Sequence, residues 1–336
     1  MSKYEYDSEQ YVLDYHYKEQ CIRQKNFLTE NIDFNNISSI MEVGAASGYN
    51  LSLYKSDGRI LTGIEPSERN CHLAKSNYQI NIFPGMFKEY LQSEEKRKFD
   101  LIFLSMVLEH IVDPARFIHD CRQLCNKYIF IDVPTLDIRH APEEPMGVFS
   151  DEHVNLFTLD GLNSLMSSEG FGLVNVENIY GINKYIPAGY PSIATIWEKD
   201  AADINASRYR YNLFSAEELL DKYLADSKSE LKIVQNKIDK IPPDMNLAVW
   251  GIGNHASMLL ANTSLKNKNI VRVYDSDIKK HFLNFAGVEI SAFNKEDVEN
   301  GIVNGILITT YTAQKSILKY IKSQNINCPV IVLYDI

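Results

Sequence analysis

The sequence predicts an α/β protein made of two units, the second smaller than the first. Over the first 200 residues apolar and helical segments alternate, and the apolar ones lie at 38–43, 59–64, 100–105 and 128–133. Apolar strands separated by helices are typical of a parallel sheet covered on both faces. The alternation restarts after a long helical segment, with apolar segments at 246–250, 270–274, 305–309 and 329–333. These segments predict the second α/β unit.

Capping signals mark where several helices begin. Ser67 is a plausible N-cap, Asp113 and Pro114 supply the acid and proline of a helix start, and Ser215 and Glu218 have capping-box spacing. The predicted helices lie at 10–31, after Ser67, after Asp113, at 159–168 and from Ser215 to about 238, and a hairpin is predicted from 172–179 and 192–197.

Composition and charge exclude several classes of function. The 336 residues carry a net charge of −10, which argues against a nucleic-acid partner. The five cysteines include no CxxC pair, so we expect reduced thiols and no metal site. The polar N-terminus is not a signal peptide, and no apolar run approaches the roughly 18 residues of a membrane helix. We expect a cytoplasmic protein without a membrane partner; the oligomeric state is not predicted.

A glycine-rich turn follows the first strand. An apolar run ends in Glu42, and Gly44, Ala46 and Gly48 follow at alternate positions before a helix. Such a turn allows a ligand to approach the backbone and the helix N-terminus closely. Glu65 ends the next strand 17 residues after Gly48, where an acid can accept the hydroxyls of a ribose.

Two ligands suit this geometry, a dinucleotide and S-adenosylmethionine. Dinucleotide sites prefer the order G-x-G-x-x-G, whereas the even spacing here, with Glu42 inside the strand end, fits S-adenosylmethionine better. The alternatives are a tight strand–helix turn without ligand and, for Glu65, a solvated acid at a helix N-terminus.

Several motifs in order resemble those of class I S-adenosylmethionine-dependent methyltransferases. They are Glu42–Gly48, Gly63–Ser67, Phe99–Pro114, Glu152–Gly161 and Ser167–Phe171. The resemblance covers about 200 residues and implies a doubly wound, mostly parallel seven-stranded sheet that ends in an antiparallel hairpin. Two departures are Ala46, where the family has a glycine, and Cys125-Asn-Lys127, where the family has a Lys-Pro-Gly-Gly turn.

The resemblance implies S-adenosylmethionine as cofactor. Gly44, Ala45 and Gly48 are then expected beneath its amino-acid part, Glu65 at the ribose, residues 85–87 near the adenine and 105–106 at the methionine end. The expected cofactor-binding residues are Glu42, Gly44, Ala45, Gly48, Glu65, Pro66, Met86, Phe87, Ser105 and Met106.

Histidine is the first candidate for a catalytic base, because it titrates near neutral pH. His153 lies near the end of the aperiodic stretch 134–157, which we expect to cover the acceptor. The preceding Asp151 and Glu152 could orient it or raise its pKa. His110 is the rival. The alternative for His153 is a capping or packing role beside Phe157.

The C-terminal half resembles the Rossmann-like module of sugar-nucleotide methyltransferases, notably C-methyltransferases of deoxysugar pathways. The resemblance rests on the segments 249–256, 273–277, 285–290 and 307–321. Those enzymes also have a Glu-His pair where Glu152 and His153 fall, but their N-terminal cysteine-rich zinc domain has no counterpart here. O-, N- and C-methylation therefore stay open.

The resulting hypothesis is methyl transfer to a sugar, most plausibly nucleotide-linked, in surface-polysaccharide or deoxysugar biosynthesis. One alternative is an NAD-dependent oxidoreductase that uses Gly251, Gly253 and Asp275, which lies 22 residues after Gly253. Another is a non-catalytic cofactor-binding scaffold. The expected domains are a methyltransferase domain at 1–200, a helical linker at 201–244 and a Rossmann-like domain at 245–336.

Overall fold

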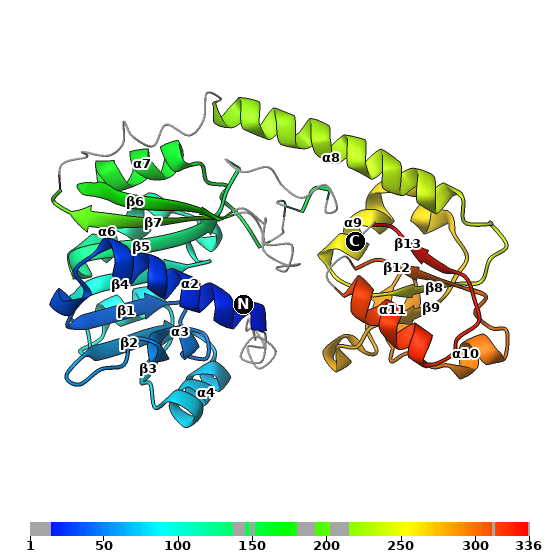
Figure 1. Ribbon diagram of the computed structural model, residues 1–336, viewed down its shortest axis with the longest axis horizontal. Helices are drawn as coiled ribbons and strands as arrows, with labels where there is room; N and C mark the ends of the chain where they lie inside the picture. Colours follow the sequence, from blue (N-terminus) through cyan, green and yellow to red (C-terminus); the bar gives the residue numbers. More distant parts are fainter. Residues whose placement is uncertain are drawn as a thin grey trace. The chain divides into compact units, whose positions relative to one another are not determined.

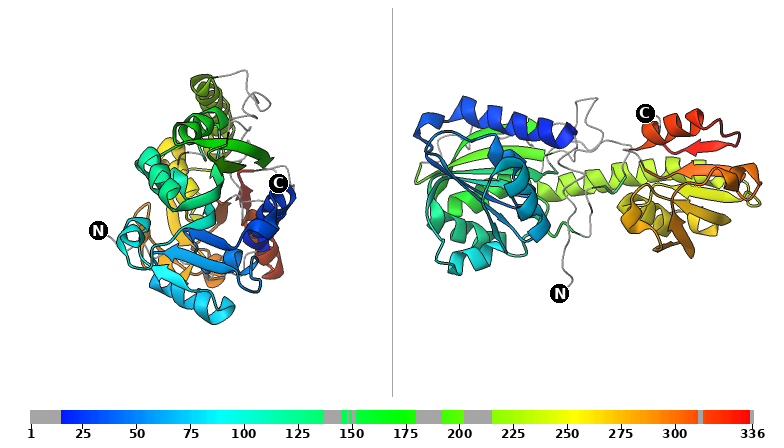
Figure 2. Two further views of the ribbon diagram at one scale, coloured as in Figure 1. Left: turned by 90° about the vertical axis from the view of Figure 1, so that its left-hand side faces the viewer. Right: turned by 90° about the horizontal axis from the view of Figure 1, so that it is seen from below.

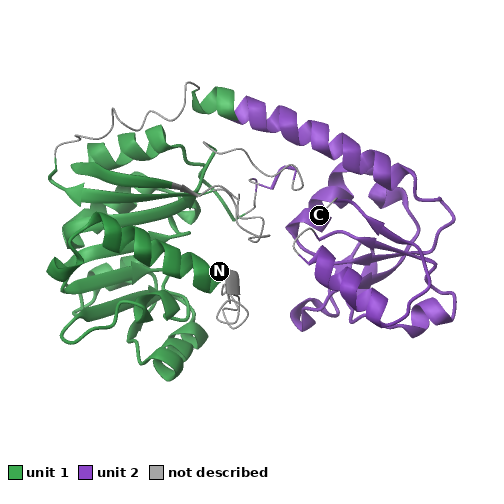
Figure 3. Cartoon of the chain, viewed as in Figure 1, with its two compact units in different colours: residues 1–139, 151–219 green, residues 140–150, 220–336 purple. Residues whose placement is uncertain are grey.

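The computed structural model divides the chain into two compact units (Figure 3). Unit 1 comprises residues 1–139 and 151–219, and unit 2 comprises residues 140–150 and 220–336. The structure describes residues 15–136, 145–147, 149, 152–179, 192–201, 215–310 and 313–334. The border between the units falls inside helix α8 (Ala216–Asp239).

Unit 1 is built on a seven-stranded sheet with the order β3-β2-β1-β4-β5-β7-β6 (Figure 1). The five strands β1 to β5 run parallel, and β7 pairs antiparallel with both β5 and β6. The strands are β1 (Ser39–Val43), β2 (Ile60–Glu65), β3 (Ile82–Pro84), β4 (Phe99–Ser105), β5 (Cys125–Pro134), β6 (Phe171–Ile179) and β7 (Ser192–Lys199). The doubly wound α/β class and the terminal hairpin expected from the sequence are confirmed.

Helices cover both faces of this sheet (Figures 1 and 2). One face packs on α2 (Tyr15–Asn31), α3 (Tyr49–Ser52) and α4 (Glu68–Tyr78), and the other on α5 (Phe87–Gln92), α6 (Pro114–Leu124) and α7 (Leu159–Ser168). Successive strand residues point to opposite faces. Within β1, Met41 and Val43 accordingly join the core beside α5 to α7, whereas Ile40 joins the core beside α2 to α4.

The predicted capping residues act as caps. The Asp113 carboxylate accepts a hydrogen bond from the Arg116 N–H at 3.0 Å, with Pro114 in the first turn of α6. Ser215 and Glu218 form a reciprocal pair, in which each backbone N–H donates to the other side chain, at 2.7 and 3.2 Å. Each cap satisfies N–H groups that have no partner inside the helix.

Unit 2 repeats the architecture on a smaller scale, with a six-stranded sheet of order β10-β11-β9-β8-β12-β13. Its strands are β8 (Leu247–Trp250), β9 (Ile270–Tyr274), β10 (Asn284–Phe285), β11 (Val288–Ser291), β12 (Gly305–Ile308) and β13 (Val330–Val332). Only the edge pair β10 and β11 is antiparallel. Helices α8 and α9 (Asn254–Asn262) cover one face, and α10 (Glu296–Glu299) and α11 (Gln314–Ser323) cover the other.

The two parallel sheets share one strand order. Counted along the chain, the five parallel strands of unit 1 and of unit 2 are both arranged 3-2-1-4-5. In such sheets ligands bind at the carboxyl ends of the strands, where the order reverses beside the first strand. That point lies between β1 and β4 in unit 1. Within the described residues, no helix combines the length and the apolar character that a membrane crossing requires.

Candidate active site

The turn after β1 holds three residues with positive φ. Gly44 has φ +72°, Ala46 +43° and Gly48 +77°. A Cβ atom on Gly44 would lie 2.9 Å from Cγ2 of Val107, and one on Gly48 would lie 2.9 Å from Cβ of Ala74. Side chains at these two positions would therefore clash, so both the backbone angle and the space favour glycine. Ala46 adopts the left-handed region in spite of its Cβ, and the surrounding turn must hold it there.

Glu65 fixes the shape of this turn. Its Oε2 accepts a hydrogen bond from the Ala46 N–H at 3.0 Å, and its Oε1 accepts from the Ser67 N–H at 3.0 Å and from Asn70 Nδ2 at 3.3 Å. Burial raises its pKa, although these three hydrogen bonds act in the opposite direction. The side chain is buried, so the alternative of a solvated acid at a helix N-terminus is wrong.

Glu42 presents a second buried carboxyl group near the turn. Its Oε1 accepts a hydrogen bond from Asn50 Nδ2 at 2.8 Å, and its Oε2 is buried without a hydrogen-bond partner among the described residues. Burial and, to a smaller extent, the nearby Glu65 carboxylate raise its pKa to about 8, although the Asn50 hydrogen bond acts in the opposite direction. Glu42 therefore keeps its proton near neutral pH and offers a polar atom to a ligand.

The other expected cofactor residues follow the carboxyl ends of neighbouring strands. Ser105 ends β4, and its Oγ accepts a hydrogen bond from Gln24 Nε2 at 2.9 Å. Met106, with φ +52°, donates its N–H to the Asp132 carbonyl at 2.8 Å. Met86 is exposed and caps α5, whereas the Phe87 ring is buried with its centroid 4.9 Å from that of Phe117.

The ten expected residues lie at or just after the carboxyl ends of β1, β2, β3 and β4, which are adjacent in the sheet. Ala45 is buried and Pro66 is exposed. Because the carboxyl ends of parallel strands meet at one edge, these residues share an edge of the sheet. Their contact with a cofactor stays a prediction.

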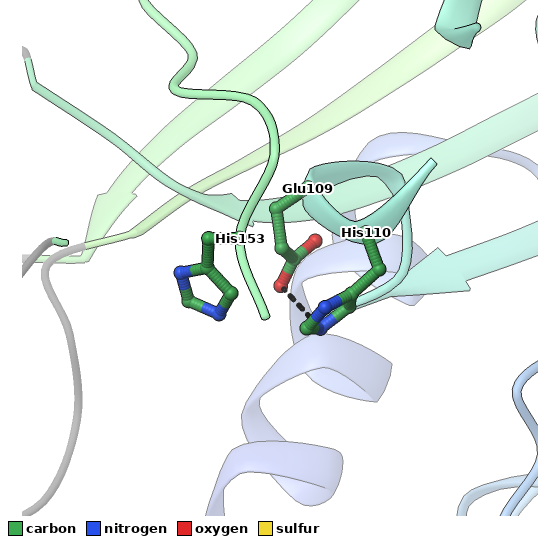
Figure 4. Close-up of side chains that lie close together, drawn as sticks. All are labelled: Glu109, His110 and His153. Atoms are coloured by element: carbon green, nitrogen blue, oxygen red, sulfur yellow. Dashed lines mark ion pairs between the residues drawn. The ribbon is translucent and has the colours of Figure 1, made fainter. Parts of the chain in front are cut away.

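The candidate catalytic histidines lie together with an acid (Figure 4). The ring centroids of His110 and His153 are 4.9 Å apart, and His110 Nε2 is 3.8 Å from Glu109 Oε1. Glu109 is buried, and burial raises its pKa to about 8. The N–H groups of Val154 and Asn155 donate to the Glu109 carbonyl at 2.9 and 3.1 Å. These bonds fasten the segment that carries His153 to the 3-10 helix η2 (Leu108–His110).

The electrostatics of His153 differ from the sequence-based expectation. Burial lowers its pKa, the neighbouring His110 lowers it further, and Glu152 raises it by less. The net effect is a pKa below the usual value, so the ring is neutral at pH 7. The backbone carbonyl of Glu152 accepts a hydrogen bond from His110 Nδ1 at 2.8 Å, while its side chain is exposed.

A buried acid at the end of β5 was not a candidate from the sequence. Asp132 is fully buried, and its Oδ2 accepts hydrogen bonds from Gln24 Nε2 at 2.6 Å and Gln20 Nε2 at 3.3 Å. Arg23 lies 3.6 Å from the same oxygen. The available signal was an acid inside an otherwise apolar strand, between Ile131 and Val133. Glu109 lay inside a recognised motif, but its burial could not be read from the sequence.

Unit 2 contains a similar turn in a different electrostatic setting. Asp275, the residue after β9, accepts hydrogen bonds from the Ile252 N–H at 2.7 Å and the Asp277 N–H at 2.9 Å. Lys280 Nζ lies 3.3 Å from its Oδ2. Gly251 has φ +94°, and a Cβ there would lie 2.5 Å from Thr310 Cγ2. The acid thus braces the preceding turn, as Glu65 does, but a lysine neutralises it.

Unit 1 is a doubly wound α/β domain, and its glycine turn lies at the edge where such sheets generally bind ligands. Residues 13–177 match a family model described as a methyltransferase domain. That segment therefore carries a methyltransferase domain, in agreement with the sequence motifs.

Curated relatives match shorter segments. A ubiquinone biosynthesis O-methyltransferase of Nitrosomonas europaea is 26% identical over 117 residues, which are 33% of this chain and 49% of that protein. The protein of the same description from Coxiella burnetii is 30% identical over 88 residues, which are 25% of this chain and 38% of that protein. The chain thus spans less than half the length of these relatives.

Solved structures match about half of the chain at low sequence identity. An S-adenosylmethionine-dependent methyltransferase from Archaeoglobus fulgidus is 17% identical with a TM-score of 0.43, and the match covers 54% of this chain and 94% of that one. Magnesium protoporphyrin IX methyltransferase from Synechocystis, solved with bound S-adenosylhomocysteine, is 13% identical with a TM-score of 0.41, over 55% and 83% of the two chains.

Proposed function

We propose that the protein transfers a methyl group from S-adenosylmethionine to a sugar acceptor, most simply a nucleotide-linked sugar, in surface-polysaccharide or deoxysugar biosynthesis. The observation that carries the methyl transfer is the turn at 44–48, braced by Glu65, at one edge of a sheet whose sequence matches a methyltransferase domain. The curated relatives are named O-methyltransferases, which favours a hydroxyl oxygen as the acceptor atom.

Two features of this edge fit the cofactor. Gly44 leaves space that a Cβ would fill, and Glu42 has a buried oxygen without a partner among the described residues. Gly44, Ala45 and Gly48 would support the amino-acid part of the cofactor, and Glu65 the ribose. When bound, S-adenosylmethionine supplies a methyl group already activated by its positive sulfur.

The chain's own task is then to place the acceptor and to remove its proton. As the acceptor oxygen bonds to the methyl carbon, the carbon–sulfur bond breaks and its electron pair stays on sulfur, and the hydroxyl proton must leave. A neutral imidazole can accept it, and His153 is neutral at pH 7 because its pKa is lowered. We assign His153 as the base, with His110 and Glu152 beside it.

The sugar rests on the resemblance of the C-terminal half to sugar-nucleotide methyltransferases, supported by the parallel 3-2-1-4-5 sheet of unit 2. The oxidoreductase alternative requires Asp275 to accept ribose hydroxyls. Its Oδ2 lies 3.3 Å from the Lys280 ammonium, which competes with ribose hydroxyls and disfavours NAD. We retain 1–200, 201–244 and 245–336 as the proposed domain limits.

The decisive experiment is mass spectrometry of the protein with S-adenosylmethionine and a panel of nucleotide sugars. A gain of one methyl group on one sugar is expected, and methylation of none of them would refute the sugar assignment. Calorimetry with S-adenosylhomocysteine tests the cofactor separately, and absence of binding would contradict methyl transfer altogether.

Glu65→Gln and Asp275→Asn form a matched pair for the cofactor site. Each replaces a buried acid that braces a glycine turn. Only Glu65→Gln should weaken S-adenosylhomocysteine binding, by at least tenfold. Fluorescence titration with NADH should show no binding, whereas binding that Asp275→Asn abolishes would favour the oxidoreductase.

A further inference from the structure

Glu109, His110 and His153 bring three metal-binding side chains together beside the methyltransferase edge (Figure 4). One potential ligand atom from each lies within 4.8 Å of the other two. We propose that these three residues form a binding site for a divalent transition-metal ion. The cysteine pattern predicts no metal, and this site uses no cysteine.

Glu109 offers a buried carboxyl oxygen to a cation. It is buried, its Oε2 has no hydrogen-bond partner among the described residues, and the ion pair recorded for it is with His110, at 3.8 Å. Buried carboxylates are generally paired or coordinate a metal, and such a group releases its proton when a metal ion binds.

The hydrogen bond of His110 selects the tautomer that a metal requires. Its Nδ1 lies 2.8 Å from the carbonyl oxygen of Glu152. A carbonyl can only accept, so Nδ1 carries a proton and, in the neutral ring, Nε2 presents its lone pair. That lone pair lies 3.8 Å from Glu109 Oε1, so a cation between the two atoms could bind both. Metal-bound histidines almost always donate their second nitrogen to a carbonyl, carboxylate or water in this way.

The backbone places the third ligand. The Val154 and Asn155 N–H groups bond to the Glu109 carbonyl, so the chain next to His153 is fixed to the residue that supplies the carboxylate. Metal–ligand bonds of 2.0–2.2 Å hold ligand atoms roughly 3.3–3.5 Å apart in a tetrahedral site. The ligand atoms, which lie within 4.8 Å of one another, would thus have to move closer by about 1 Å. Rotation of the side chains can supply a movement of this size.

Two imidazoles and one carboxylate favour Zn²⁺, Co²⁺ or Fe²⁺ over Mg²⁺ and Ca²⁺, which prefer oxygen ligands. Three protein ligands leave a coordination position open. An acceptor hydroxyl could take it, and this use of the ion rests on the proposed methyl transfer. His153 would then be a ligand instead of a base; the ion would lower the pKa of the hydroxyl, whose proton would leave to solvent.

The test uses the full-length protein after chelation and dialysis, without S-adenosylmethionine or acceptor. Calorimetric titration with ZnCl₂ and visible absorption during titration with CoCl₂ should each show one site. Glu109→Gln and His153→Gln should each weaken binding by at least tenfold. The matched control is His119→Gln, which removes another histidine–glutamate contact of unit 1, 3.1 Å from Glu169, and should leave binding unchanged.

Stoichiometric binding that survives both site variants, or no stoichiometric binding by the wild type, would overturn the proposal. Circular dichroism checks the fold of each variant. If Glu109→Gln does not fold, the His153→Gln variant provides the test, because His153 is only half-buried. The ion and the cofactor are titrated separately, so failure of metal binding would leave the proposed methyl transfer standing with His153 as base. Failure of S-adenosylhomocysteine binding would leave the metal site standing.

Discussion

Replacing Gly44 with alanine should disturb the cofactor turn more than the same change at another glycine with positive φ. The matched control is Gly58, whose φ is +79° and around which an added Cβ would meet nothing within 4 Å. Gly44 has nearly the same φ, but an added Cβ would lie 2.9 Å from Cγ2 of Val107. The pair separates the effect of backbone conformation from that of space.

The expected magnitudes follow from these two contributions. A left-handed conformation costs a non-glycine residue roughly 1–2 kcal/mol, which both variants share. Forcing a methyl group into an occupied space adds about 1–3 kcal/mol, which applies to Gly44→Ala alone. We therefore expect Gly44→Ala to lower the free energy of unfolding of unit 1 by about 2–5 kcal/mol and Gly58→Ala by about 1–2 kcal/mol.

Urea denaturation followed by tryptophan fluorescence can read unit 1 by itself. The chain has two tryptophans, Trp197 in the core of unit 1 and Trp250 in unit 2. In a Trp250→Phe background, the emission of Trp197 reports the unfolding of unit 1. Calorimetry with S-adenosylhomocysteine adds a second measurement, in which Gly44→Ala should bind at least tenfold more weakly and Gly58→Ala normally. Equal losses of stability in the two variants would refute the close approach at Gly44.

Three further outcomes are expected. Burial raises the folded-state pKa of Glu42 to about 8, so the stability that this side chain contributes is present below about pH 4.5 and is lost as the pH rises towards 8. In urea denaturation, Glu42→Gln should therefore be more stable than the wild type at pH 8.5 but not at pH 4.5. A stability difference that does not change with pH would contradict this. Gln24→Ala should lower the free energy of unfolding by about 2–3 kcal/mol, because it removes the 2.6 Å hydrogen bond to buried Asp132. Gln20→Ala removes a 3.3 Å hydrogen bond to the same oxygen and should lower it by less than about 1 kcal/mol. Equal losses would show that the Gln24 hydrogen bond does not stabilise Asp132 more than the Gln20 hydrogen bond does. Asp113→Ala should cost about 1 kcal/mol through the lost cap of α6, measurable by the same denaturation, and no loss would argue against the cap.

The long central strands could be predicted from the sequence because they are apolar on both faces. In β4 every residue but the last is buried, which leaves a continuous apolar run in the sequence. The edge strand β3, with only three residues and a proline, was missed, as was the two-residue β10. Such short edge strands bury too little surface to leave a pattern, and their pairing depends on neighbours that are distant in the sequence.

Some residues of the candidate site could likewise be predicted from the sequence, and others could not. The glycine turn and Glu65 could be predicted because their spacing along the chain follows from local geometry. The burial of Glu109 and Asp132, and the approach of His153 to His110 across 42 intervening residues, depend on tertiary packing. For this reason the net direction of the His153 pKa shift was wrong when it was inferred from the adjacent acids alone.

The acids at the ends of β2 and β9 have a consequence for mutational data. Glu65 and Asp275 each accept a hydrogen bond from a backbone N–H of the preceding glycine turn, so each would score as intolerant to substitution in a screen for folded protein. Intolerance there would report the shape of the turn, whether or not a ribose ever binds. An acid at this position in a related chain therefore indicates the structure of the turn. A ligand titration is needed to show that the acid also binds a cofactor.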